Sequence, residues 1–122
     1  NDVDPYALAA VRLNAGTNRV TVACRPGDLL DGECDEVDVV LAGDVFYSRD
    51  MSRRMLGFLA RALARGSDVL VGDPGRAYLP RERLEVLASY QVPMVGALED
   101  AEIKQTDVLR PLPAIADGAS PR

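Results

Sequence analysis

The stretch that most constrains the fold of this chain runs from Val37 to Tyr47 and reads VDVVLAGDVFY. It begins with a compact, β-branched apolar run that a single acid interrupts, and it stops abruptly at Gly43-Asp44. A short run that is apolar on both faces is typical of a strand in the middle of a parallel sheet covered on both sides. Ligands of open α/β sheets bind beyond the carboxyl ends of the strands. Asp44, Phe46 and Tyr47 are therefore predicted to lie at a functional site.

Composition limits the classes of protein that fit these 122 residues. The chain is 48% hydrophobic and 27% charged, which is typical of one globular domain of ordinary size. Its formal net charge of −5 disfavours nonspecific binding to nucleic acid, which requires a basic face. No apolar run approaches the length of a membrane span, and no signal-peptide pattern is present. We therefore expect neither a nucleic-acid partner nor a membrane partner.

The chain contains no histidine and two cysteines, Cys24 and Cys34. A zinc site built from cysteine and histidine is excluded, and so is catalysis that uses histidine. The cysteine spacing is unlike that of metal ligands, so we interpret the pair as free thiols and expect a reducing, cytoplasmic location.

Helical signals occupy three segments, residues 5–15, 50–65 and 81–90. Asp4-Pro5 favours a helix start, because Asp accepts hydrogen bonds from free backbone N–H groups and Pro suits the first helical position. Asp50 is expected to cap the second helix, and Gly16 and Gly66 are expected to end the first and second. The second helix is predicted to bury one face, made of Met51, Met55, Leu59 and Leu63.

Strand signals alternate with these helices, at residues 19–24, 37–43, 68–72, 92–97 and 103–109, and residues 1–4 resemble the tail of a further strand. The last two strands are joined by an acidic turn and are therefore expected to form an antiparallel pair. Alternating strands and helices indicate a three-layer α/β fold. We expect residues 110–122 to be a flexible tail.

The order and spacing of four blocks resemble the second half of class I S-adenosylmethionine-dependent methyltransferases. The blocks are DVDPYALAAVRLNAGTN, a later GD, then DVVLAGDVFY, then VLVGDP. Within that superfamily, the Asp-x-x-Tyr of Asp44–Tyr47 and the loop GDPGRAYLP resemble the group that includes the electron-transfer-flavoprotein β-subunit lysine methyltransferases. The resemblance covers about residues 1–110. It implies S-adenosylmethionine as cofactor and a Rossmann-like three-layer sandwich, with a mostly parallel sheet that ends in an antiparallel hairpin.

The resemblance also implies a domain truncated at its N-terminus. The family's strand order is 3-2-1-4-5-7-6, and its first strand, its Gly-rich loop and most of its second strand have no counterpart here. These strands would stand between residues 19–24 and 37–43. We therefore interpret residues 1–109 as the C-terminal portion of a methyltransferase domain, and expect the 122 residues alone not to hold the native fold stably.

Three positions are implied to contact the cofactor. Asp2 would accept hydrogen bonds from both ribose hydroxyls, although the same acid would also serve a dinucleotide in a Rossmann dehydrogenase. Asp28 would accept one from the adenine amine. Its alternative is an acid in an ordinary Gly-Asp turn. Gly43 is assigned to the cofactor site as well.

Asp44 and Tyr47 are predicted to be catalytic. Methyl transfer to an amine is an in-line displacement at a sulfonium, and a lysine with a reference pKa of about 10.4 is mostly protonated at neutral pH. Asp44 is expected to orient the incoming nitrogen, while Phe46 and Tyr47 line the lysine stem and face its charge. Much of the rate would come from positioning. The alternative is an acid that caps the next turn, with both aromatic rings packed into the core.

The loop after the next strand supplies two predicted substrate contacts, Asp73 and Arg76. Arg76 is expected to pair with an acidic partner or with Asp73, and a simple turn is the alternative. Aspartates at strand ends also suggest Mg²⁺, but a phosphate-binding loop is missing, so we expect no metal site. The sequence predicts methyl transfer to a protein lysine. A small-molecule N-methyltransferase and a non-catalytic nucleotide-binding remnant are the alternatives.

Overall fold

The computed structural model describes residues 1–93 and 103–113. The chain divides into two compact units, Asn1–Glu33 and Cys34–Arg122, and each is described by itself. Both cysteines are free, as predicted. Among the described residues, no helix combines the length and apolar character that crossing a bilayer requires.

The first unit contains helix α1, Pro5–Asn18. Its start is as predicted, because the Asp4 carboxylate accepts a hydrogen bond from the Tyr6 N–H at 2.8 Å and Pro5 takes the first position. The predicted end at Gly16 is wrong by two residues. The side chains of Thr17 and Asn18 hydrogen-bond to carbonyls one turn earlier, which supports the extra residues.

The predicted strand over residues 19–24 is wrong, because these residues have no strand partner in the part of the chain that is described. A strand requires a ladder of hydrogen bonds to a neighbour, and a β-branched sequence alone does not supply one. Residues 1–4 likewise form no strand. Only an isolated parallel bridge joins Asp2 to Pro26.

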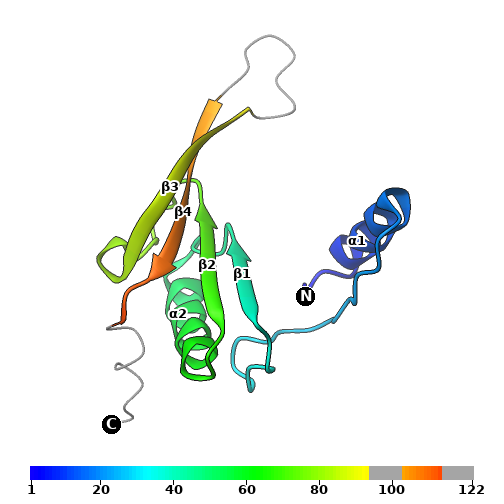
Figure 1. Ribbon diagram of the computed structural model, residues 1–122, viewed down its shortest axis with the longest axis horizontal. Helices are drawn as coiled ribbons and strands as arrows, with labels where there is room; N and C mark the ends of the chain where they lie inside the picture. Colours follow the sequence, from blue (N-terminus) through cyan, green and yellow to red (C-terminus); the bar gives the residue numbers. More distant parts are fainter. Residues whose placement is uncertain (94–102, 114–122) are drawn as a thin grey trace. The chain divides into compact units, whose positions relative to one another are not determined.

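The second unit is built on a sheet of four strands in the order β1-β2-β4-β3, with α2 packed against it (Figure 1). The strands are β1 Val39–Gly43, β2 Asp68–Asp73, β3 Leu84–Pro93 and β4 Ile103–Pro111. β1 and β2 are parallel, whereas β2–β4 and β3–β4 are antiparallel. The fold is α/β as predicted, but the described sheet is mostly antiparallel, which corrects the expectation of a mostly parallel one.

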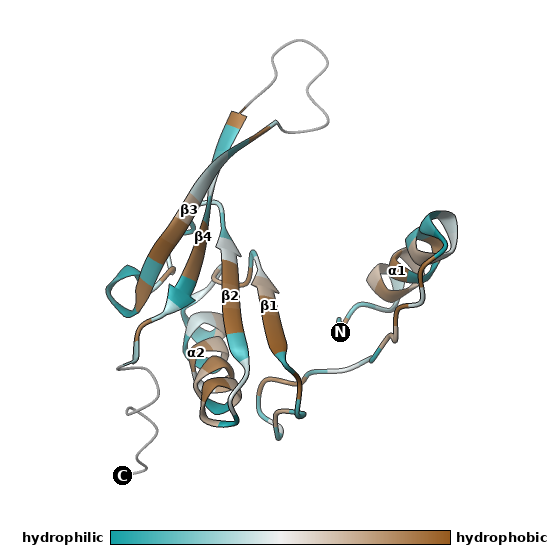
Figure 2. Ribbon diagram, viewed as in Figure 1, coloured by the Kyte–Doolittle hydropathy of each residue, from teal (hydrophilic) through white to brown (hydrophobic). Residues whose placement is uncertain are grey.

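The sequence predicted that strand β1 lies in the middle of the sheet. In the structure β1 lies at the edge. Val40 and Ala42 pair with the buried Val69 and Val71 of β2. On the other face Leu41 is 75% exposed, so the apolar run that Figure 2 shows along β1 is buried on one face only. The run is apolar on both faces, but within this unit a helix covers just one of them.

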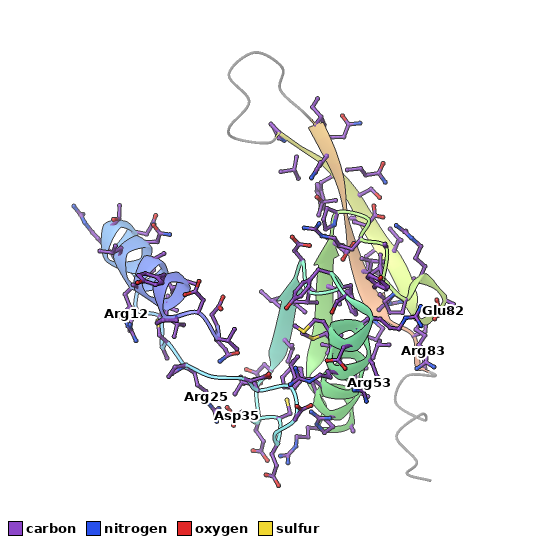
Figure 3. The ribbon with its side chains drawn as sticks, turned by 180° about the vertical axis from the view of Figure 1, so that it is seen from behind. Arg12, Arg25, Asp35, Arg53, Glu82 and Arg83 are labelled. Atoms are coloured by element: carbon purple, nitrogen blue, oxygen red, sulfur yellow. The ribbon has the colours of Figure 1, made fainter. Side chains whose placement is uncertain are left out.

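Helix α2 spans Arg49–Ala64, and its cap differs from the prediction. Ser48, not Asp50, is the cap residue, and its hydroxyl accepts a hydrogen bond from the Met51 N–H at 3.2 Å. Asp50 instead forms an exposed ion pair of 2.8 Å with Arg53. Arg53 is labelled on α2 in Figure 3. Gly66 ends the helix as predicted, with a φ of 88° that favours glycine.

The core of the second unit lies between α2 and the sheet. Of the predicted face, Met55 and Leu59 are buried, whereas Met51 and Leu63 are only half-buried. Ser52 and Ala62 are buried on the same side of the helix. Three side chains from outside the helix are among the most deeply buried of the unit, namely Phe46, Val71 and Leu109. This packing fixes the ends of β1 and β2 relative to the start of α2.

The predicted helix over residues 81–90 is wrong. Only a 3₁₀ turn forms, Arg81–Arg83, and β3 begins at Leu84 and pairs with β4. Glu82 and Arg83 of the turn are exposed and lie at the outer edge of the unit in Figure 3. The predicted antiparallel pair is confirmed. Its first strand was predicted to start at residue 92 but starts eight residues earlier, at Leu84. Residues 94–97 of the predicted strand lie outside the described residues.

Candidate active site

Asp44 follows β1 directly and is held in a left-handed backbone conformation, with φ of 52°. Its N–H donates to the Gly72 carbonyl at 2.8 Å, which extends the pairing of β1 with β2 by one residue. A left-handed conformation is uncommon for residues other than glycine, although Asp and Asn adopt it most readily. The side chain is 51% exposed. The structure therefore presents this carboxylate to solvent at the end of the strand, as the sequence predicted.

The carboxylate of Asp44 is held by Arg76 from the loop after β2. Arg76 Nε donates to one Asp44 oxygen at 2.6 Å and Nη2 donates to the other at 2.7 Å. The hydrogen bond and charge of Arg76 lower the pKa of Asp44, and the charge of Lys104 lowers it further. In turn, Asp44 raises the pKa of Arg76. Asp44 is therefore ionised at neutral pH. The acidic partner expected for Arg76 is this residue, not the Asp73 carboxylate.

Asp73, at the end of β2, is completely buried. One of its oxygens accepts hydrogen bonds from the N–H of Gly75 at 2.8 Å and of Arg76 at 2.7 Å. Its other oxygen is also buried, and it has no hydrogen-bond partner among the residues that the structure describes. Asp73 was predicted to contact substrate, but a buried carboxylate that holds two backbone N–H groups shapes the loop instead.

The two aromatic residues after Asp44 lie in different environments. Tyr47 is 60% exposed, which suits a side chain that meets a ligand. Phe46 is 0% exposed and packs in the core. The expectation that Phe46 lines a substrate stem is therefore corrected: its ring is fully buried and does not meet solvent.

Asp2 and Asp28, the two acids assigned to the cofactor, lie on neighbouring segments of the first unit. The bridge between Asp2 and Pro26 is reinforced by the Gly27 N–H, which donates to the Asp2 carbonyl at 3.3 Å. The Asn1 amide also donates to the carbonyls of residues 25 and 27, at 2.7 and 2.8 Å. Each carboxylate accepts a backbone N–H two residues later at 2.9 Å. Both carboxylates are therefore oriented by the local backbone.

Gly43, the third cofactor position, lies in the second unit at the last position of β1. A Cβ built at Gly43 meets no atom within 4 Å, and the same holds for Gly72, its partner across the β1–β2 pair. The two glycines leave a surface free of side chains beside Asp44, onto which a flat ligand could fit.

A second buried acid, Asp107 of β4, was not predicted. It pairs with Asp73 across the sheet and accepts hydrogen bonds from Ser89 at 2.6 Å and Gln105 at 3.1 Å. These hydrogen bonds, and to a lesser degree the charge of Arg81, lower the pKa of Asp107. The sequence signal that could have identified Asp107 is its position two residues before Leu109, in an alternating pattern. Among the described residues, no three His, Cys, Asp or Glu side chains are grouped to hold a metal ion.

The chain is similar to several curated methyltransferases. It is 33% identical to the electron transfer flavoprotein beta subunit lysine methyltransferase of Danio rerio over 99 residues, which cover 76% of this chain and 38% of that protein. The protein of the same name from Xenopus laevis is 32% identical over 75% of this chain and 40% of its own length. That of Homo sapiens is 36% identical over 62% of this chain and 30% of its own length. No family model matches the chain.

These matches confirm the predicted resemblance to this lysine methyltransferase group. The chain spans about two fifths of the length of the curated relatives it matches.

Proposed function

We propose that this chain, which resembles lysine methyltransferases over three quarters of its length, takes part in S-adenosylmethionine-dependent methyl transfer to a protein lysine. One structural observation carries the proposal: an ionised, solvent-facing carboxylate, Asp44, ends β1, and the exposed phenol of Tyr47 follows three residues later. The names of the relatives support an amine acceptor on a protein. A Rossmann-like arrangement of the whole domain is part of this proposal.

The proposed cofactor contacts belong to both units, and each one rests on the geometry of its own unit. S-adenosylmethionine would supply a methyl group on a sulfonium. We assign the ribose hydroxyls to Asp2 and the adenine amine to Asp28, because both carboxylates are already oriented by backbone N–H groups. Gly43 leaves open space above the strand end.

Asp44 orients the acceptor in this mechanism. Its carboxylate accepts a hydrogen bond from the lysine nitrogen and directs the lone pair toward the methyl group. A carboxylate is a much weaker base than a lysine amine, so the proton of the lysine ammonium leaves to water. The gain in rate therefore comes from positioning. Tyr47 packs against the lysine stem and faces its charge.

The acceptor protein we propose is the electron transfer flavoprotein β subunit, which the names of the relatives give as their substrate. The test uses the protein from the complete coding sequence, purified acceptor protein and cofactor with an isotopically labelled methyl group. Mass spectrometry of the digested acceptor is expected to find the label on a lysine side chain. Transfer to a small amine without transfer to protein would support the small-molecule alternative. No transfer combined with tight cofactor binding would support the non-catalytic remnant.

A further inference from the structure

We propose that Arg76 is a built-in competitor for the acceptor site, whose guanidinium occupies the oxygens of Asp44 until a cationic acceptor displaces it. This inference rests on the proposed function, in which the lysine nitrogen binds Asp44. It adds a rule for the site: the acceptor ammonium and the Arg76 guanidinium exclude each other from Asp44, whereas a neutral group does not displace Arg76.

The proposed competition is inferred from the geometry of the pair. Both oxygens of Asp44 are engaged, at 2.6 and 2.7 Å, by the two nitrogens of one guanidinium. A carboxylate keeps further lone pairs, so a neutral donor would still find an acceptor there. An ammonium would not bind well beside a guanidinium, because the positive charge of Arg76 cancels the attraction of Asp44. A lysine ammonium therefore binds strongly only when Arg76 moves away.

The pair is weak enough to open. The Arg76 side chain is 44% exposed and that of Asp44 is 51% exposed, so water screens their attraction and can solvate the released guanidinium. When Arg76 leaves, a lysine ammonium restores the positive charge beside Asp44. A neutral acceptor does not, so it cannot take the place of the Arg76 guanidinium.

The backbone of the loop holds Arg76 in place while its side chain moves. Asp73 is the positioning residue, because its buried oxygen accepts the N–H of Arg76 at 2.7 Å and that of Gly75 at 2.8 Å. Farther along the loop, the Tyr78 carbonyl accepts a hydrogen bond from Ser52 of α2 at 2.9 Å. With both points fixed, the guanidinium can leave Asp44 and return to the same position.

The first test compares the acceptor KM of Arg76→Gln with that of the wild type in the complete protein. Losing the competitor is expected to lower this KM about twofold to fivefold, the factor that corresponds to an exposed ion pair of ordinary strength. The KM for S-adenosylmethionine is expected to stay unchanged. Arg110→Gln is the matched control, since it removes the same charge from another exposed ion pair, with Glu85 at 2.8 Å, and should leave both values unchanged. An acceptor KM that is unchanged or higher in Arg76→Gln would overturn the proposal.

A second pair of variants tests the positioning role of Asp73. Asp73→Ala removes the acceptor of two backbone N–H groups and is expected to lower the acceptor KM as Arg76→Gln does. Asp73→Asn keeps an oxygen acceptor and is expected to stay near the wild-type value. Equal KM values in the wild type, Asp73→Ala and Asp73→Asn would contradict this role. An effect of Asp73→Ala that persists undiminished in the Arg76→Gln background would contradict it as well.

A readout that needs no turnover separates this inference from the proposed function. The ¹⁵N NMR signal of the Arg76 Nε–H, assigned by its loss in Arg76→Gln, is followed during titration with Nα-acetyl-lysine methylamide. We expect the lysine analogue to shift this signal, and the 6-hydroxynorleucine analogue, which has a neutral hydroxyl in place of the ammonium, to leave it in place. A shift in a protein that transfers no methyl group would support the competition between Arg76 and the acceptor but contradict the proposed methyltransferase function. Normal methyl transfer without a shift at saturating analogue would reject the competition alone.

Discussion

At the scale of single residues, the site depends on how Asp44 and Arg76 set each other's protonation. Arg76 lowers the pKa of Asp44 in the folded state. The stabilisation from this pair is therefore complete above the ordinary carboxyl pKa and is lost as pH falls through the lowered folded-state value. Arg76→Gln should move the titration midpoint of Asp44 upward, toward its ordinary value. Carboxyl ¹³C NMR across the acidic range measures this, and coincident curves for the two proteins would refute it.

The cofactor residues make a separate prediction. Asp2→Ala removes a carboxylate that a backbone N–H orients at 2.9 Å, so it should weaken S-adenosylmethionine binding roughly tenfold, as expected for lost hydrogen bonds to a charged acceptor. The acceptor KM should hardly change. Calorimetric titration of the complete protein with cofactor checks this. Unchanged affinity would leave Asp2 as a solvated loop acid.

Some of the residue-scale features were predictable and others were not. An acid that follows an apolar strand directly lies at the strand end, so the position of Asp44 follows from local sequence. Its exposure does not, because Asp73 has the same position at the end of the next strand and is completely buried. Its contact with Arg76, across 32 residues, depends on a loop shape that Asp73 and Gly75 set together. An aromatic residue after a strand can face either way, which is why the burial of Phe46 did not follow from its position.

At the scale of elements, α2 gives a direct test of capping. Ser48→Ala removes the hydroxyl that accepts the Met51 N–H and should lower the free energy of unfolding by about 1 kcal/mol. Asp50→Ala, the control on the residue that the sequence had favoured as the cap, breaks only an exposed ion pair and should cost less. Thermal unfolding of both variants gives the comparison. A larger loss for Asp50→Ala would assign the cap to that residue.

Long periodic elements followed from the sequence, whereas short ones depended on their neighbours. α2 and β2 were predicted nearly to their ends, because their apolar patterns are long or compact. Residues 84–90 carry leucines at helical spacing, yet they form β3 because β4 offers a complete partner edge. Residues 19–24 have an equally strong strand pattern and no described partner, so they stay irregular.

At the scale of the whole molecule, the second unit exposes an apolar sheet edge. Leu41 of the edge strand is 75% exposed, and edge strands with exposed apolar side chains tend to pair with other chains. We expect the isolated 122-residue chain to self-associate as its concentration rises, and Leu41→Lys to suppress this. Sedimentation velocity over a concentration series measures both. A chain that stays monomeric throughout would contradict the expectation.

The measurement that bears most directly on the proposed function is single-turnover methyl transfer by Asp44→Asn in the complete protein, alongside its affinity for S-adenosylmethionine. Asparagine keeps the shape and tolerates the left-handed backbone at this position, so mainly the negative charge is lost. We predict a rate lowered about hundredfold, as for other charge-orienting groups, with cofactor affinity unchanged. A rate near that of the wild type, or equal loss of rate and cofactor binding, would show that Asp44 does not orient the acceptor.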